Sequence, residues 1–171
     1  MKKSLLVSLF ALLVVSLAVS GAMAQKLGFN GIGGRLSYVD AEGVDGTIGF
    51  GAHANLGNII ENLTLYPSIE YWTKGEGVVD FSSFSINGDA RYYIPTSGSV
   101  NVFAGGGLAL LFNKVSVGTF DDSETKLGLD LLGGIDIPVS DNLSATAKIK
   151  FVVSSDNILK ITGGLTYILK K

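Results

Sequence analysis

The residues of this 171-residue chain that could do chemistry are a single histidine, His53, and a set of charged side chains that recur at every second position. Hydrolysis by a serine requires a histidine base that a carboxylate orients. No serine, aspartate and histidine constellation is recognisable around His53, and one histidine excludes a histidine-rich metal site. The sequence therefore predicts no catalytic residue, no metal site and no cofactor, and His53 is interpreted as a polar residue of a strand.

The charged side chains are predicted to share one face of several β-strands, because strand side chains alternate between two faces. The nine predicted to point inward are Arg35, Glu70, Asp89, Arg91, Asp130, Asp136, Lys148, Lys150 and Lys160. One interpretation is a charged path for transport. The other, which we favour, is a network of ion pairs that fills the interior, because an unpaired buried charge is costly.

The segment from Phe84 to Ile94 shows most clearly how these charges are positioned. Its even-numbered residues are apolar or small, its odd-numbered residues include Asp89 and Arg91, and Pro95 ends the run. Turn-rich sequences divide the chain into eight runs with this period of two. The runs lie near 28–39, 47–57, 62–73, 83–94, 99–112, 125–137, 142–153 and 158–169.

Eight such strands fit either a soluble barrel with its apolar face inside or a transmembrane barrel with its apolar face in lipid. Aromatic residues distinguish the two, because membrane barrels place aromatic girdles at both interfaces. The apolar faces supply these girdles: Tyr38, Phe50, Tyr71, Phe84, Phe112 and Phe151 near one rim, and Tyr92 and Tyr167 near the other. We therefore expect an all-β, eight-stranded, antiparallel up-and-down transmembrane β-barrel.

The first 24 residues match a cleavable signal peptide. Lys2 and Lys3 precede an apolar core from Leu5 to Val19, and Ala22-Met23-Ala24 is a cleavage site of the A-x-A type. The mature chain, 25–171, has the length of one domain, the barrel. Removing two of the 13 lysine and arginine residues leaves 11 against 15 acidic residues, and this net charge of −4 argues against nucleic acid as a partner.

Two segments carry a family resemblance, 65–72 (LYPSIEYW) and 87–95 (NGDARYYIP). Together with the signal peptide and the eight strands, they make the chain similar to the small bacterial outer-membrane β-barrel family, which includes OmpX and the membrane domain of OmpA. One departure is the end of the chain, Leu169-Lys170-Lys171, where such proteins often carry an aromatic residue. The resemblance implies an outer-membrane monomer that contacts lipid and lipopolysaccharide and uses the barrel-insertion machinery.

Both chain ends are expected on the periplasmic side of the outer membrane, because these barrels have short periplasmic turns and longer external loops. The predicted turns are 57–61, 95–98 and 138–141, and the predicted external loops are 40–46, 74–82, 113–124 and 154–157. The external loops are acidic and could hold Ca²⁺ or Mg²⁺, although solvated loops without a ligand are the favoured interpretation.

The predicted function is that of a non-enzymatic barrel with a plugged lumen, which serves envelope structure or surface interaction. Two alternatives stay open. One is a narrow pore or a conduit for a small ligand, and the other is a lipid-modifying enzyme of the outer membrane.

Overall fold

The computed structural model describes residues 26–169, so the predicted signal peptide, 1–24, and the last two lysines lie outside the described residues. Eight strands make up this part of the chain. They are β1 (Lys26–Ala41), β2 (Val44–Ile60), β3 (Leu63–Glu76), β4 (Val79–Ile94), β5 (Asn101–Val117), β6 (Phe120–Ser140), β7 (Leu143–Val153) and β8 (Ile158–Ile168). No helix within residues 26–169 is long and apolar enough to cross a membrane.

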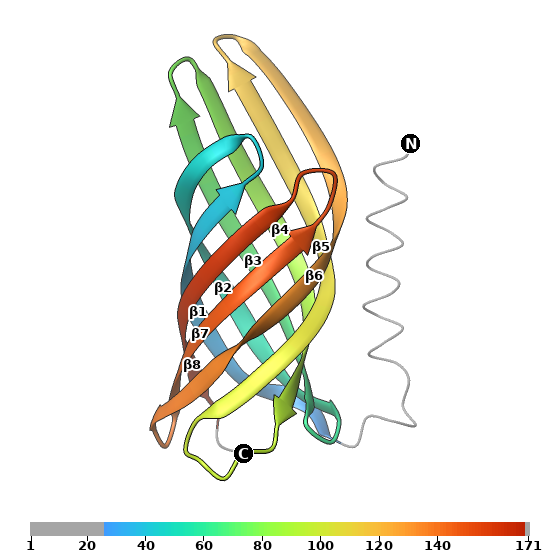
Figure 1. Cartoon of the computed structure of the whole chain (residues 1–171), viewed down its shortest axis with the longest axis vertical. Helices are drawn as coiled ribbons and strands as arrows, with labels where there is room; N and C mark the ends of the chain where they lie inside the picture. The colour runs from blue at the N-terminus through green and yellow to red at the C-terminus, as the bar shows by residue number, and fades with distance from the viewer. Residues whose placement is uncertain (1–25, 170–171) are drawn as a thin grey trace.

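The strands form one closed barrel in sequence order, and every neighbouring pair is antiparallel (Figure 1). Strand β8 pairs with β1 along its whole length, from Ile168 opposite Gly31 to Ile158 opposite Ala41. Closure leaves the sheet without a free edge around this circumference. The expectation of an eight-stranded, antiparallel up-and-down barrel is confirmed.

The two faces of the sheet differ as the period-two pattern predicts. Outward side chains are apolar and exposed, for example Leu36 at 63% and Ile149 at 57%. The residues on either side of Ile149 point inward, and Lys148 and Lys150 are 4% and 2% exposed. A hydrophobic outside around a polar inside is the arrangement of a barrel whose wall lies in lipid.

The end of the barrel that carries the β1–β2, β3–β4, β5–β6 and β7–β8 connections is called the hairpin end here, and the opposite end is called the terminal end. At the hairpin end the strands are longer than predicted. Segments 74–82 and 113–124, expected as loops, are instead the ends of paired strands. Tight turns at Gly77 and Gly118 join them, with φ of +64° and +59°, a conformation that glycine adopts without strain.

The two long hairpins form one continuous four-stranded sheet that rises beyond the rest of the barrel (Figure 1). Val117 pairs with Val79 of β4 on one side and with Phe120 of β6 on the other. In contrast, β7 begins to pair with β6 at Leu129, opposite Val153. The part of β6 that precedes Leu129 therefore extends past the end of β7.

Several predicted girdle residues lie side by side on the outer wall. Phe50 of β2 pairs with Tyr71 of β3, Tyr71 with Phe84 of β4, and Phe84 with Phe112 of β5. The ring centroids of Phe50 and Tyr71 are 5.7 Å apart, and those of Phe84 and Phe112 are 6.1 Å apart. Tyr38, Tyr92, Phe151 and Tyr167 are also on the outer face.

Candidate functional site in the lumen

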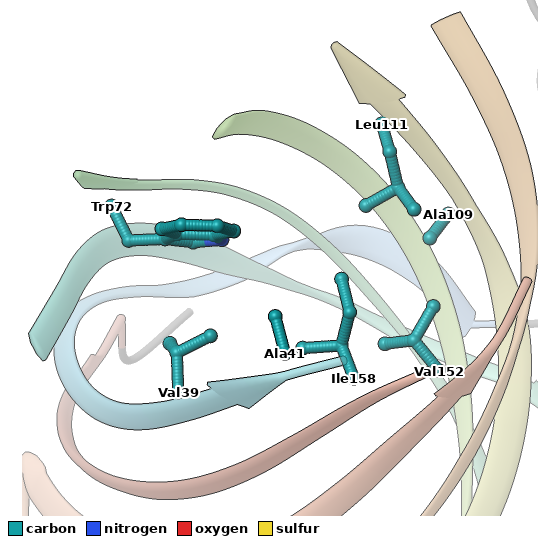
Figure 2. Packing of buried hydrophobic residues seen from close by; sticks show 7 residues of the cluster. All are labelled: Val39, Ala41, Trp72, Ala109, Leu111, Val152 and Ile158. Atoms are coloured by element: carbon teal, nitrogen blue, oxygen red, sulfur yellow. The ribbon is translucent and has the colours of Figure 1, made fainter. Parts of the chain in front are cut away.

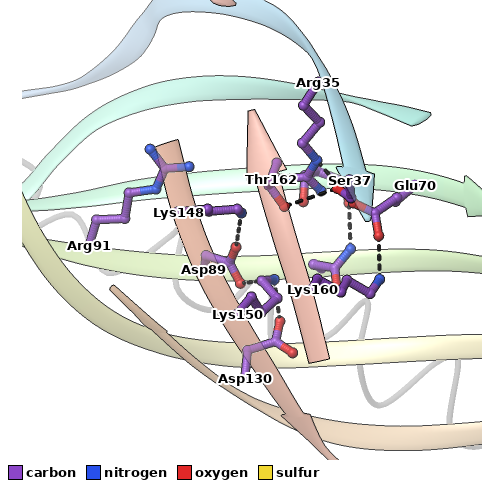
Figure 3. A network of polar contacts seen from close by, with 12 residues as sticks. Arg35, Ser37, Glu70, Asp89, Arg91, Asp130, Lys148, Lys150, Lys160 and Thr162 are labelled. Atoms are coloured by element: carbon purple, nitrogen blue, oxygen red, sulfur yellow. Dashed lines mark hydrogen bonds and ion pairs between the residues drawn. The ribbon is translucent and has the colours of Figure 1, made fainter. Parts of the chain in front are cut away.

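The central lumen is organised around the carboxylate of Asp89. The ammonium group of Lys150 donates hydrogen bonds to Asp89 Oδ1 at 2.8 Å and to Asp130 Oδ2 at 2.7 Å (Figure 3). Lys148 Nζ lies 3.6 Å from Asp89 Oδ2, beyond hydrogen-bond distance. Three strands, β4, β6 and β7, thus contribute charges to one buried cluster.

A second cluster surrounds Glu70 of β3. Arg35 Nε lies 3.4 Å from Glu70 Oε2, and Lys160 Nζ donates to Glu70 Oε1. Ser37 Oγ donates to Glu70 Oε2 at 3.0 Å and shares a hydrogen bond of 2.9 Å with Thr162 Oγ1. The carboxylate thereby links β3 to β1 and β8 across the lumen (Figure 3).

A third cluster lies toward the terminal end and combines Asp136 with aromatic residues. Tyr93 and Thr146 each donate a hydrogen bond of 2.5 Å to the Asp136 carboxylate. Arg91 Nη1 is 3.7 Å from Asp136 Oδ2. The guanidinium carbon of Arg91 also lies over the rings of Tyr66 and Phe103, 3.8 Å and 4.6 Å from their centroids, which is a cation–π geometry.

All nine charged residues predicted to face inward are buried in the lumen. Five are basic and four are acidic, so they carry a formal excess of one positive charge (5 − 4 = +1). Of the three lysines, Lys148 has the poorest hydrogen bonding, because its Nζ has no hydrogen-bond partner among the described residues. The three clusters together form what we call the charged layer of the lumen.

The inward-facing glycines explain how such large side chains fit. A Cβ on Gly107 of β5 would lie 2.9 Å from Asp89 Oδ1, and one on Gly134 of β6 would lie 2.7 Å from Lys148 Cβ. Contacts this short are not tolerated between packed atoms. Gly105 and Gly107 of β5 and Gly134 of β6 therefore make room for charged side chains on the neighbouring strands.

His53 lies in the same lumen and is 5% exposed. Its Nε2 shares a hydrogen bond of 2.8 Å with Thr166 Oγ1, while Nδ1 has no hydrogen-bond partner among the described residues. Ser68, its partner across the β2–β3 ladder, is equally buried. No carboxylate in residues 26–169 hydrogen-bonds to His53, so a serine hydrolase arrangement is not formed in this region.

Apolar inward residues form a cluster between the charged layer and the hairpin end (Figure 2), and the sequence did not predict that they gather into one layer. We call it the apolar layer, and its buried members are Val39, Ala41, Trp72, Ala109, Leu111, Val152 and Ile158. A signal for it exists, because the inward face changes from charged to apolar within single strands. On the inward faces, the next residue after Lys150 is Val152 and the next after Glu70 is Trp72. In β8 the order is reversed, and Ile158 comes before Lys160.

Two cavities flank these layers. One of about 130 Å³ opens at the hairpin end beside the apolar layer, with Trp72 and Phe81 in its lining. The other, of about 310 Å³, opens at the terminal end and is lined by polar residues such as Asn55, Asn58 and Asp136. The charged layer lies between these two openings.

The acidic residues of the hairpin end are partly paired with lysines. Lys114 Nζ is 2.8 Å from Asp121 Oδ2, and Lys126 contacts both Glu124, at 2.5 Å, and Asp156. No group of three or more histidine, cysteine or carboxylate side chains in the described chain is arranged to hold a metal ion.

Comparison with known proteins gives one family and a set of similar structures. A family model described as the outer membrane protein beta-barrel domain matches residues 9–167. No curated protein matches the sequence.

Three solved structures illustrate the similarity of fold. Neisserial surface protein A (NspA) has 19% identity and a TM-score of 0.70, over 81% of this chain and 96% of that one. Ail, the attachment invasion locus protein of Yersinia pestis, has 18% identity and a TM-score of 0.59, over 84% and 99%. The N-terminal β-barrel domain of Pseudomonas aeruginosa OprF has 13% identity and a TM-score of 0.61, over 83% and 99%.

Proposed function

This chain belongs to the outer membrane protein β-barrel family, and on that premise we propose that it is a non-enzymatic surface protein that binds an extended, basic partner segment at the open edge of β6. The family implies the bacterial outer membrane. We place the chain termini in the periplasm, after cleavage of a signal peptide at 1–24, and the hairpin end outside the cell. In this orientation the long hairpins extend into the medium, the usual asymmetry of such barrels.

The observation that carries the proposal is the difference in length between β6 and β7. Strand β6 begins at Phe120, whereas its pairing with β7 begins at Leu129. The backbone of an unpaired strand edge is a template for another strand. The opposite edge of the protruding sheet, in β3, is covered instead, because Thr47 Oγ1 donates to the Thr73 carbonyl at 2.8 Å.

The charge of the β6 edge defines the partner. Asp121 and Asp122 are exposed near its tip; Asp121 is paired with Lys114, whereas Asp122 has no ion-pair partner among the described residues, so a second copy of this strand would be repelled and a basic strand attracted. A structure of Ail contains the heparin analogue sucrose octasulfate. The acidic edge of this chain would repel such a polyanion, which makes a basic protein segment the better candidate here.

The charged layer supports a structural role for the lumen rather than transport. An eight-stranded barrel leaves space inside for side chains alone, and here large, ion-paired side chains occupy that space. The protein would then act as a monomer surrounded by lipid and lipopolysaccharide after insertion by the barrel machinery. Single-channel recording in a planar bilayer tests the plug, and steady ion conductance would favour the pore instead.

Binding at the β6 edge is tested with the refolded barrel in phosphatidylcholine vesicles and two labelled peptides, one alternating Lys and Val and the other Glu and Val. We expect saturable, salt-sensitive binding of the lysine peptide, together with slower hydrogen exchange of β6 amides near the tip. The double variant D121N/D122N should weaken binding, whereas D80N, in the same sheet but away from the edge, should not. Binding without amide protection in β6 would contradict strand addition.

A further inference from the structure

The cavity at the hairpin end is apolar on the side that faces the apolar layer. Its apolar lining comes from Ala41, Val44, Trp72, Phe81 and Ile158, which belong to or pack against the apolar layer. Trp72 belongs to this cluster (Figure 2) and is 6% exposed. The cavity therefore has a hydrophobic floor, and the apolar layer separates it from the charged layer below.

Its size suits a small ring. A cavity of about 150 Å³ with an apolar lining stays dry and binds benzene, and the volume here is about 130 Å³. Two aromatic side chains, Trp72 and Phe81, belong to the lining. Ring faces attract cations as well as other aromatic groups.

The rim of the cavity carries three carboxylates, Glu42, Glu124 and Asp156, and one ammonium group, that of Lys114, which is paired with Asp121 at 2.8 Å. Glu124 and Asp156 share the ammonium group of Lys126. Glu42 has no ion-pair partner among the described residues, and its carboxylate accepts a hydrogen bond of 3.3 Å from the backbone N–H of Asn157. The rim thus presents one carboxylate that no lysine neutralises.

The walls of the cavity are held in place by bonds between separate connections. The backbone N–H of Glu42 donates to the carbonyl of Asn157 at 3.0 Å, which joins the β1–β2 turn to the β7–β8 loop. Lys126 joins the same loop to β6 through Asp156. A preformed site loses less conformational entropy when a ligand binds.

We propose that this cavity is a binding site for a small organic cation whose apolar body has about the size of a benzene ring. The ring packs against Trp72 and Phe81, and the positive group lies at the rim beside Glu42. This proposal is independent of the β6 edge, because it uses the inner side of the hairpin end rather than the outer strand of the protruding sheet.

Trp72 is the single tryptophan of the chain, so tryptophan fluorescence of the refolded barrel reports on this cavity directly. Three water-soluble probes share one ring and differ in charge: benzyltrimethylammonium, benzyl alcohol and benzenesulfonate. A non-ionic detergent is required, because choline and amine-oxide headgroups resemble the proposed ligand. We expect a saturable change with the cation, about tenfold weaker binding of the alcohol and no binding of the sulfonate.

Variants locate the binding. E42Q should reduce the affinity for benzyltrimethylammonium to that for benzyl alcohol and leave the alcohol unchanged. E61Q removes the same charge at the terminal end and should change neither. A41L fills the cavity and should abolish binding of both ligands, while heat-modifiable migration in SDS gels verifies that each variant is folded. Equal, unsaturable responses to all three probes, or an E42Q barrel that binds the cation normally, would overturn the proposal.

Discussion

The charged layer and the apolar layer occupy the same lumen but are built by opposite chemistry. In the charged layer, hydrogen bonds to Asp89 and Asp130 stabilise the buried ammonium group of Lys150. In the apolar layer, Leu111 and Val152 are buried without any polar partner. The difference teaches that the inner face of one strand can serve two purposes, with ion pairs that link strands in the middle and a hydrophobic seal toward the hairpin end.

The largest effect is expected from breaking the hub of the charged layer. Lys150→Met leaves Asp89 and Asp130 buried with Lys148 as the nearest cation, and loss of one partner from a buried ion pair costs about 3–5 kcal/mol. Lys148→Met is the matched control on the same strand face. Because Lys148 lies 3.6 Å from Asp89 and makes no hydrogen bond within the described chain, its replacement should lower the free energy of unfolding by less than Lys150→Met does.

Urea unfolding of the refolded barrels in vesicles, followed by Trp72 fluorescence, measures both free energies. Equal effects of the two substitutions would mean that the layer responds to total charge rather than to the hub at Asp89.

The next effect concerns the wall around the charged layer. Ile149 lies between Lys148 and Lys150 in β7 and faces outward. Arginine there should cost about 2–4 kcal/mol if lipid surrounds it, whereas arginine at the girdle residue Phe84 should cost about 0–1 kcal/mol for the charge. The same unfolding experiment checks this. Similar costs at the two sites would contradict the assignment of Ile149 to the middle of the lipid band.

A smaller effect is expected in the apolar layer. Leu111→Ala removes buried methyl groups from the apolar layer, and the cost should be about 2 kcal/mol, at the low end for such truncations because other residues of the layer border a cavity and can relax. Leu131→Ala on the outer wall is the control and should cost less, since lipid fills the space. An effect of Leu111→Ala as large as that of Lys150→Met would remove the energetic distinction between the layers.

The smallest effect is expected at the exposed pair of Lys114 and Asp121 on the protruding hairpin. Hydrogen bonds from Lys114, and to a smaller extent from Ser116, lower the pKa of Asp121. The stabilisation from this pair is therefore fully present above the unfolded pKa of Asp121, and it is lost as the pH falls through the folded pKa. Exposed pairs contribute little. Lys114→Gln should therefore raise the pKa of Asp121, measured by carbon NMR of its carboxylate, without a measurable change in stability. An unchanged pKa would show that Lys114 is not its cause.

The sequence was sufficient to predict the number of strands and the face on which each residue lies, because both follow from alternation along a single strand. Asp89, Arg91 and Lys150 could be placed inside in this way. Which cation meets which acid could not be predicted, since pairing depends on the register between strands. Lys160 of β8 meets Glu70 of β3, two strands that are not neighbours in the barrel.

The strand ends and the apolar layer were harder to predict from the sequence, for related reasons. Outside the lipid band both faces of a strand can be polar, so the serines and acids of 113–124 resemble a loop although Asn113 pairs with Glu124 in a regular ladder. Trp72, Leu111 and Val152 come from three distant strands. They lie at the same depth because of the stagger between the strands, which the sequence of a single strand does not specify.

The closure of β8 on β1 also constrains the order in which the molecule folds. These strands are the most distant in sequence, and the hydrogen bond between Ser37 and Thr162 joins residues 125 positions apart. Contacts of such separation form late, because loop-closure entropy must be overcome first. Lys160 reaches Glu70 from β8, so an unclosed chain holds Glu70 without this cation. Completion of the seam and neutralisation of the interior are thus one cooperative event, which disfavours a half-assembled barrel in the membrane.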